Sequence, residues 1–368
     1  MTTAAEEALS TWTRAQALER VDTRWTPALM GRFAGVVREA LERAPETTRR
    51  MGLVRIARTI LRGDEHVRRA LGRDSALGRW TAAMEGAMAR SSPLEPWLML
   101  TPRFGLGAAI LMEADLEATI VVGSGGRARI PADGRVLQGP PGRPLRVVVR
   151  SGELETHARG PRRAGDFEVV DGDGEAGATP EVHPLSGGSL PEILRPLAAG
   201  AACLTSTDPE LAQEVAALAP VLVGVRGAKD VSHSASLADA RGCIWLTPVE
   251  RPLVVAETLV HEASHLKFFL AEDLAPFVTD SDPPRFEVPW RSDRRPLRAV
   301  LMGLHAWVRV LEWLARLEGG ALAQPARERA TVLARATDAA AEIVAAADGL
   351  TPEGESLVAA LCRRTGDR

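Results

Sequence analysis

One stretch with two histidines four residues apart constrains the fold and the function of this chain more than any other feature. Residues 254–269 read VVAETLVHEASHLKFF and contain His261, Glu262 and His265. Side chains four residues apart lie on one face of an α-helix, so the two imidazoles can bind one ion together, with the Glu262 carboxylate beside them. The flanking residues are mostly apolar, and a buried imidazole needs a metal or a hydrogen-bond partner. The stretch therefore predicts a buried helix that carries a metal site.

The chain has 368 residues, which is long enough for two or three domains. Residues 1–100 show helical spacing of apolar side chains with polar and proline breaks, and we expect a helical N-terminal region there. The predicted helices of this region cover residues 6–21, 27–43, 47–71 and 75–90.

The period changes in residues 101–185, where residues 116–122 and 145–150 are rich in β-branched side chains and partly alternate. We expect a small antiparallel β region there. Residues 186–368 then form the expected HExxH metal-binding catalytic domain with C-terminal helices. The predicted fold class is α+β, mostly helical, with a metal-binding HExxH helix-bundle core.

Charge and cysteine content narrow the class of protein. The net charge is −3, which does not indicate a protein that binds nucleic acid or a membrane surface. Cys203, Cys243 and Cys362 form no CxxC pair, as is typical of a reducing compartment. No apolar run reaches the length of a membrane span, and the N-terminus lacks the pattern of a signal peptide. The expected location is the cytoplasm.

A working catalytic site needs a third protein ligand. The metzincin continuation is absent, because Phe268 and Ala271 stand where that pattern has Gly and His. The next candidate is the helix predicted over 296–314, which carries His305 among apolar residues. Glu312 on the same helix is the rival, and it would complete the His-His-Glu set of many zinc peptidases.

Four segments together resemble the HExxH-motif peptide-modification proteins. They are residues 242–246 (GCIWL), 259–265 (LVHEASH), 289–298 (PWRSDRRPLR) and 303–308 (GLHAWV). Members of that family are 2-oxoglutarate-dependent peptide β-hydroxylases associated with ribosomally synthesised and post-translationally modified peptides. The resemblance is clearest from about residue 231 to 315, and the Pro-Trp-Arg stretch with the Gly-Leu-His-Ala helix distinguishes it from zinc peptidases.

The resemblance implies an Fe(II) centre held by His261, His265 and His305. Three protein ligands leave three positions on iron, two for 2-oxoglutarate and one for O2. The expected substrate is a precursor peptide that is hydroxylated at a Cβ atom. In such an oxygenase Glu262 is not a base, and it orients a ligand or the co-substrate.

A dianionic co-substrate also needs a cation at its distal carboxylate, and a guanidinium suits this role. Arg298 and Arg309 lie seven residues before and four residues after His305 in sequence, and Arg291 and Arg295 precede the helix. We favour Arg298, followed by Arg291.

Two other functions remain open at this point. The first is a zinc metallopeptidase in which Glu262 is the water-activating base and Glu312 or His305 the third ligand. The second is a non-catalytic peptide-binding partner of a modification complex.

Overall fold

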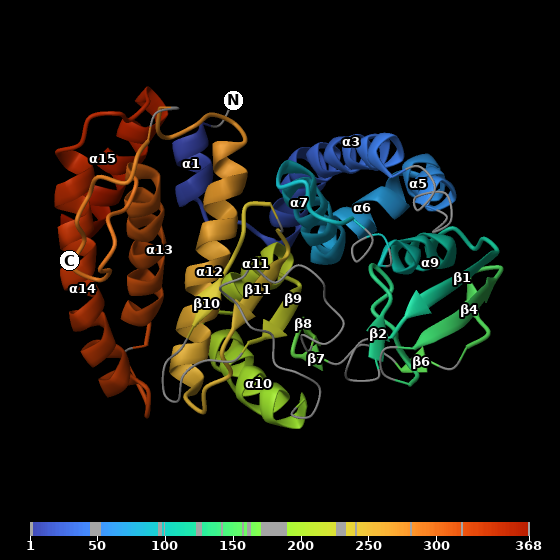
Figure 1. Ribbon diagram of the computed structural model, residues 1–368. Coiled ribbons are helices and arrows are strands. Elements are labelled where there is room, and N and C mark those ends of the chain that lie inside the picture. Colours follow the sequence, from blue (N-terminus) through green and yellow to red (C-terminus); the bar gives the residue numbers. More distant parts are fainter. Residues whose placement is uncertain are drawn as a thin grey trace. The chain divides into compact units, whose positions relative to one another are not determined.

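The chain is mostly helical with small sheets, which confirms the α+β class in this coarse form. The structure is a computed structural model that describes residues 3–44, 53–94, 98, 100–122, 127–140, 143–156, 158–159, 163–170, 190–225, 233–239, 241–279, 282–317 and 319–366 (Figure 1). No helix in these ranges combines the length and the hydropathy needed to cross a membrane.

The chain divides into two compact units, each assembled from separate stretches. Unit 1 contains Met1–Ala17, Ala199–Val215 and Arg251–Arg368, and unit 2 contains Leu18–Ala198 and Ala216–Glu250. The predicted regions ran consecutively along the chain, whereas the units follow contacts in space, so the two sets of boundaries differ. The histidine stretch and all the other predicted site residues belong to unit 1.

The predicted N-terminal helices form, but two of them are divided. The helix predicted over 6–21 is interrupted at Ser10, whose extended backbone ends α1. Of the helix predicted over 47–71, residues 47–52 lie outside the described residues, and the remainder is broken before Asp64, which accepts a hydrogen bond of 2.9 Å from the backbone N–H of Val67. The helices of this part are α1 (Ala4–Leu9), α2 (Arg14–Arg20), the π-helix η1 (Val21–Trp25), α3 (Thr26–Arg43), α5 (Leu53–Arg62), α6 (Glu65–Arg73), α7 (Ser75–Ala89) and α9 (Thr101–Leu111).

The described part of unit 2 also holds three small sheets. Strands β1 (Leu116–Val121) and β4 (Pro144–Arg150) pair antiparallel, with Leu116 opposite Val149, which confirms the two predicted strands. The first sheet has the order β1-β4-β5 and the second β2-β3-β6. The remaining strands of these two sheets are β2 (Arg127–Arg129), β3 (Val136–Gln138), β5 (Glu153–Leu154) and β6 (Ala158–Arg159).

The third sheet extends beyond the antiparallel β region expected within 101–185, because three of its strands lie between residues 221 and 246. Its order is β10-β11-β9-β8-β7, and β9 pairs in parallel with both β11 and β8. Strands β9 and β11 are buried at every residue, so they lack the alternation that marks a half-exposed antiparallel strand. The strands are β7 (Arg163–Ala164), β8 (Phe167–Val170), β9 (Val221–Gly224), β10 (Ser234–Ala235) and β11 (Cys243–Leu246).

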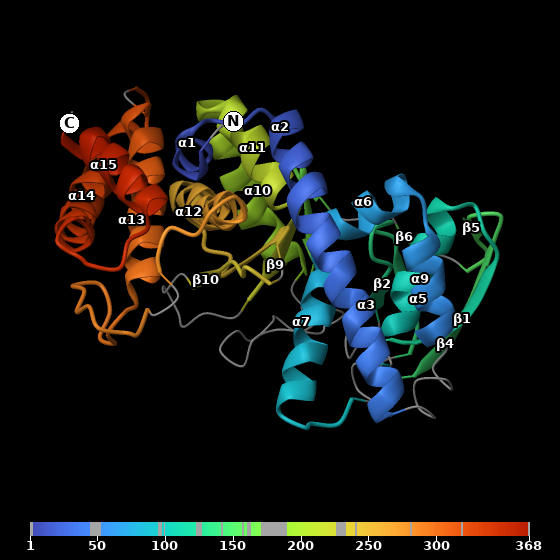
Figure 2. The ribbon, with the colours of Figure 1, turned by 90° about the horizontal axis from the view of Figure 1, so that it is seen from above.

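Unit 1 is built around α12, the helix predicted from the histidine stretch. Its helices α12 (Pro252–Glu272), α13 (Leu297–Ala315), α14 (Ala323–Ala345) and α15 (Pro352–Gly366) are joined by α1 and by the parts of α10 (Leu190–Thr207) and α11 (Pro209–Leu218) that belong to this unit. Helix α13 contacts α12, α14 and α15, and α1 contacts α12 and α15 (Figures 1 and 2). Most of α12 is buried, so its apolar residues on several faces have neighbours to pack against.

Close backbone approach and a distant cap fix α12 and α13. Gly200 lies against Val255, and a Cβ at this position would clash with that side chain. At the start of α13, Asp282 accepts hydrogen bonds from the backbone N–H groups of Leu297 at 2.7 Å and Arg298 at 2.8 Å. It thereby serves as the side-chain cap that Pro296 does not provide.

Candidate metal centre

The side chains of His261, Glu262 and His265 converge at the middle of α12. One ligand atom from each lies within 4.8 Å of the others. The Nε2 atoms of His261 and His265 are 2.9 Å apart, and the two rings are nearly perpendicular, at 88°. Two nitrogens bound to one ion at about 2.0–2.1 Å are separated by about 3.0–3.4 Å, so the pair is already close to the spacing that a shared metal requires.

Burial keeps His265 in the protonation state that binds metal. Glu262 is buried, while His261 and His265 are half-buried. Burial lowers the pKa of His265 well below 6.5, and electrostatic interaction with His261, His305 and Arg298 adds to the effect. A neutral imidazole is the form that donates a lone pair to a metal, so the site requires little proton release from His265 on loading.

Two bidentate ion pairs hold α12 on either side of the histidines. Before them, Arg329 of α14 donates to both oxygens of Glu257, at 2.8 and 2.6 Å. After them, Arg298 of α13 donates to both oxygens of Glu272, from Nε at 3.0 Å and from Nη2 at 2.5 Å. Bidentate pairs fix geometry as well as distance, so α12 is oriented against both neighbours.

His305 lies on α13 and is fully buried, but it does not belong to the group of three. Its Nε2 atom lies 2.9 Å from the carbonyl oxygen of Ala8, and its ring packs on Phe268 with centroids 5.8 Å apart. Its Nδ1 atom is buried and has no hydrogen-bond partner among the described residues. Burial, followed by the charge of Arg309, lowers the pKa of His305 to about 3. Coordination by His305 therefore stays a prediction.

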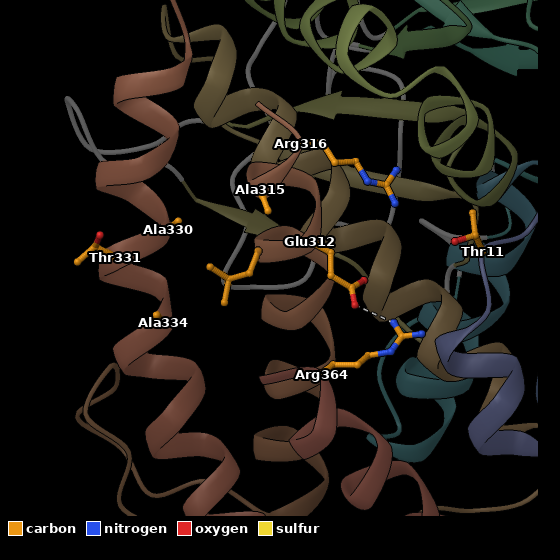
Figure 3. A pocket seen from close by; sticks show the side chains of 9 residues that line it. Thr11, Glu312, Ala315, Arg316, Ala330, Thr331, Ala334 and Arg364 are labelled. Atoms are coloured by element: carbon orange, nitrogen blue, oxygen red, sulfur yellow. Dashed lines mark hydrogen bonds and ion pairs between the residues drawn. The ribbon is translucent and has the colours of Figure 1, made fainter. Parts of the chain in front are cut away.

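Glu312, the rival third ligand, is engaged elsewhere in unit 1. Arg364 donates to its carboxylate at 2.9 Å, and both side chains line an open groove of about 840 Å³ between α13, α14 and α15 (Figure 3). Thr11 and Arg316 line the same groove. The structure does not bring Glu312 into the histidine group.

The candidate arginines each meet a carboxylate. Arg298 pairs with Glu272, and Arg309 donates to Glu214 at 2.9 Å. Arg291 and Arg295 both bind Asp293, and their hydrogen bonds lower the pKa of that residue to about 2. Of the four, Arg298 is the one whose charge acts on His265.

A buried ion network next to the histidines was not predicted. Lys267 donates to Glu214 at 2.6 Å and also to the carbonyl oxygen of Ser10, and its Nζ atom lies 4.3 Å from the ring centroid of Trp12. Arg309 donates to the other oxygen of Glu214. The side chains of Lys267 and Glu214 are completely buried. The sequence feature that could have indicated this network is Lys267, a lysine inside an otherwise apolar stretch of α12.

Comparison of the chain with models of known protein families found no match, and neither did comparison with characterised proteins.

Proposed function

We propose that the chain is an Fe(II)- and 2-oxoglutarate-dependent oxygenase that hydroxylates a Cβ atom of a ribosomally made precursor peptide. The observation that carries the proposal is the convergence of two imidazole nitrogens and the Glu262 carboxylate on one point of α12. The resemblance of residues 231–315 to peptide β-hydroxylases selects this chemistry among those that such a group supports.

The residues present fit a ferrous ion. The donors are imidazoles, which suit iron. The Nε2 atoms of His261 and His265 converge, and the buried Nδ1 atom of His305 has no hydrogen-bond partner among the described residues. His261, His265 and His305 would hold the ion. Bound iron would supply the oxidising power, with one atom of O2 entering the peptide hydroxyl, the other entering succinate, and CO2 leaving from 2-oxoglutarate.

The chain's own side chains would then position the co-substrate. Arg298 lies at the start of α13, and its charge acts on His265, so it is the favoured partner for the distal carboxylate of 2-oxoglutarate. Glu272 holds this guanidinium in place from α12. Glu262 would orient a ligand or the co-substrate from within the group.

A zinc metallopeptidase is the second candidate, because the Glu262 carboxylate stands where a water-activating base would be needed. Against it, Glu312 is paired with Arg364 and does not complete a His-His-Glu set. The oxygenase proposal does not require Glu312.

Two measurements test the proposal. Fe(II) and 2-oxoglutarate added together without air are expected to produce a visible charge-transfer band. Coexpression with a precursor peptide encoded nearby is expected to add one oxygen atom to the peptide, as detected by mass analysis. Absence of the band, together with zinc-dependent cleavage of peptides, would favour the peptidase instead.

Replacing Arg298 by leucine is expected to weaken 2-oxoglutarate binding by about 10- to 100-fold, because a charge-assisted bidentate contact is lost. The iron affinity is expected to stay unchanged. Both are measured by anaerobic titration, with the band intensity followed against 2-oxoglutarate concentration. Arg294→Leu is the control, since Arg294 is an exposed arginine of the same segment that pairs with Glu287. Equal affinity in the Arg298 and Arg294 variants would exclude Arg298 from this role.

A further inference from the structure

The end of α1 is held by side chains from three other helices of unit 1. The last carbonyl groups of a helix have no partner inside it. Here three successive carbonyl oxygens accept hydrogen bonds: that of Ala8 from His305 Nε2 at 2.9 Å, that of Leu9 from Arg364 at 3.2 Å, and that of Ser10 from Lys267. The donors come from α13, α15 and α12, respectively. The chain's first helix therefore reaches directly to a predicted metal ligand.

The contact with Ala8 determines which nitrogen of His305 carries the proton. A carbonyl oxygen only accepts, so Nε2 must be the donor. An imidazole that binds a metal is neutral and has one N–H, which here is on Nε2. Nδ1 consequently carries the lone pair, and it is buried without a hydrogen-bond partner among the described residues.

On the basis of the metal centre proposed above, on which this inference rests, we propose that His305 binds the metal through Nδ1 and that the Ala8 carbonyl is its positioning group. Metal-bound histidines commonly donate their second N–H to a backbone carbonyl or carboxylate, which fixes the tautomer and the ring orientation. His305 makes this contact in the structure. Because it lies outside the group of His261, Glu262 and His265, loading the site has to bring Nδ1 closer to them.

Two substitutions in the full chain separate the two ring nitrogens. A glutamine at position 305 places an amide N–H near the position of Nε2, and an asparagine places an amide oxygen near that of Nδ1. His305→Gln is expected to keep the bond to Ala8 and most of the thermal stability, but to bind Co(II) at least about tenfold more weakly than the original protein. His305→Asn is expected to bind Co(II) more tightly than His305→Gln and to unfold at a lower temperature, because the Ala8 carbonyl loses its donor.

Arg364→Gln is the matched control. It removes the side chain that holds Leu9, next to Ala8, and leaves His305 in place. Thermal stability is expected to fall and Co(II) affinity to stay unchanged. This outcome would show that the loss of metal binding in His305→Gln does not follow from loosening α1.

Different outcomes of these measurements would overturn coordination by Nδ1 alone or the proposed function as well. Unchanged Co(II) affinity in both His305 variants, or loss in the asparagine variant alone, would overturn coordination by Nδ1 while leaving the metal centre on α12 standing. Failure of the original protein to bind metal would overturn both. Nitrogen NMR of histidine-labelled original protein gives a readout that needs no variant. On addition of Zn(II), the Nδ1 signal of His305 is expected to shift while Nε2 keeps its proton, and a shift at Nε2 instead would refute the assignment.

Discussion

Replacing His261 or His265 by alanine is expected to lower the affinity for Fe(II) and Co(II) by more than about 100-fold, because each removes one of the two imidazoles that already converge. Metal content after purification should fall from one ion per chain to a small fraction. Isothermal titration and the Co(II) absorption spectrum measure the effect. The spectrum also reports whether any remaining ion keeps nitrogen ligands.

His66→Ala is the control for this pair, since His66 is an exposed histidine in unit 2. It is expected to bind metal as the original protein does. Retention of tight binding in His261→Ala and His265→Ala would mean that the ion sits elsewhere, and the proposed function would fail with it. Thermal unfolding of the metal-free variants checks that the loss of metal binding does not result from a failure to fold.

Replacing Glu214 by glutamine is expected to lower the free energy of unfolding by about 3–5 kcal/mol, because the change leaves two buried cations without their shared carboxylate. Lys267 and Arg309 both donate to Glu214, whose side chain is fully buried. Denaturant unfolding of the metal-free protein measures the loss. Glu287→Gln, which breaks the exposed pair with Arg294 in the same unit, is expected to cost at most about 1 kcal/mol.

The loss of unfolding free energy caused by Glu214→Gln should also depend on pH. Burial alone would raise the pKa of Glu214, but Arg309 and Lys267 outweigh it and hold the pKa below the ordinary value of 4.5. A carboxylate with a lowered folded-state pKa stabilises the protein above its unfolded pKa and loses this contribution as the pH falls through the folded value. The difference in stability between the original protein and the variant should therefore be constant near pH 7 and shrink below about pH 4.5. A difference that grows on acidification would contradict the role of the network.

Helical periodicity was enough to predict α12 and α13. Apolar residues recur through both, prolines stand at or near their starts, and the observed helices span Pro252–Glu272 and Leu297–Ala315. The meeting of His261 with His265 follows from the same geometry, because a spacing of four residues brings side chains together inside one helix. The spacing of residues within one segment is therefore enough to predict a helix and the side chains that meet on it.

The surroundings of these histidines could not be predicted, because they depend on contacts between distant segments. Lys267 and Glu214 are 53 residues apart, and Arg309 and Glu214 are 95 apart. No periodic pattern links such positions. The partner of His305 is a backbone carbonyl, which has no residue type to recognise in a sequence. The same reason explains why the acid partners of Arg298 and Arg309 were missed.

The bond between His305 and Ala8 joins positions 297 residues apart, and this has a consequence for how the protein is made. During translation at about 5–20 residues per second, α1 leaves the ribosome on the order of 15–60 seconds before its acceptor oxygens meet their donors. In that interval its buried alanines and the adjoining Trp12 lack the side chains that bury them in the folded protein. Nascent chains are thus expected to need a holding chaperone until His305 has been synthesised.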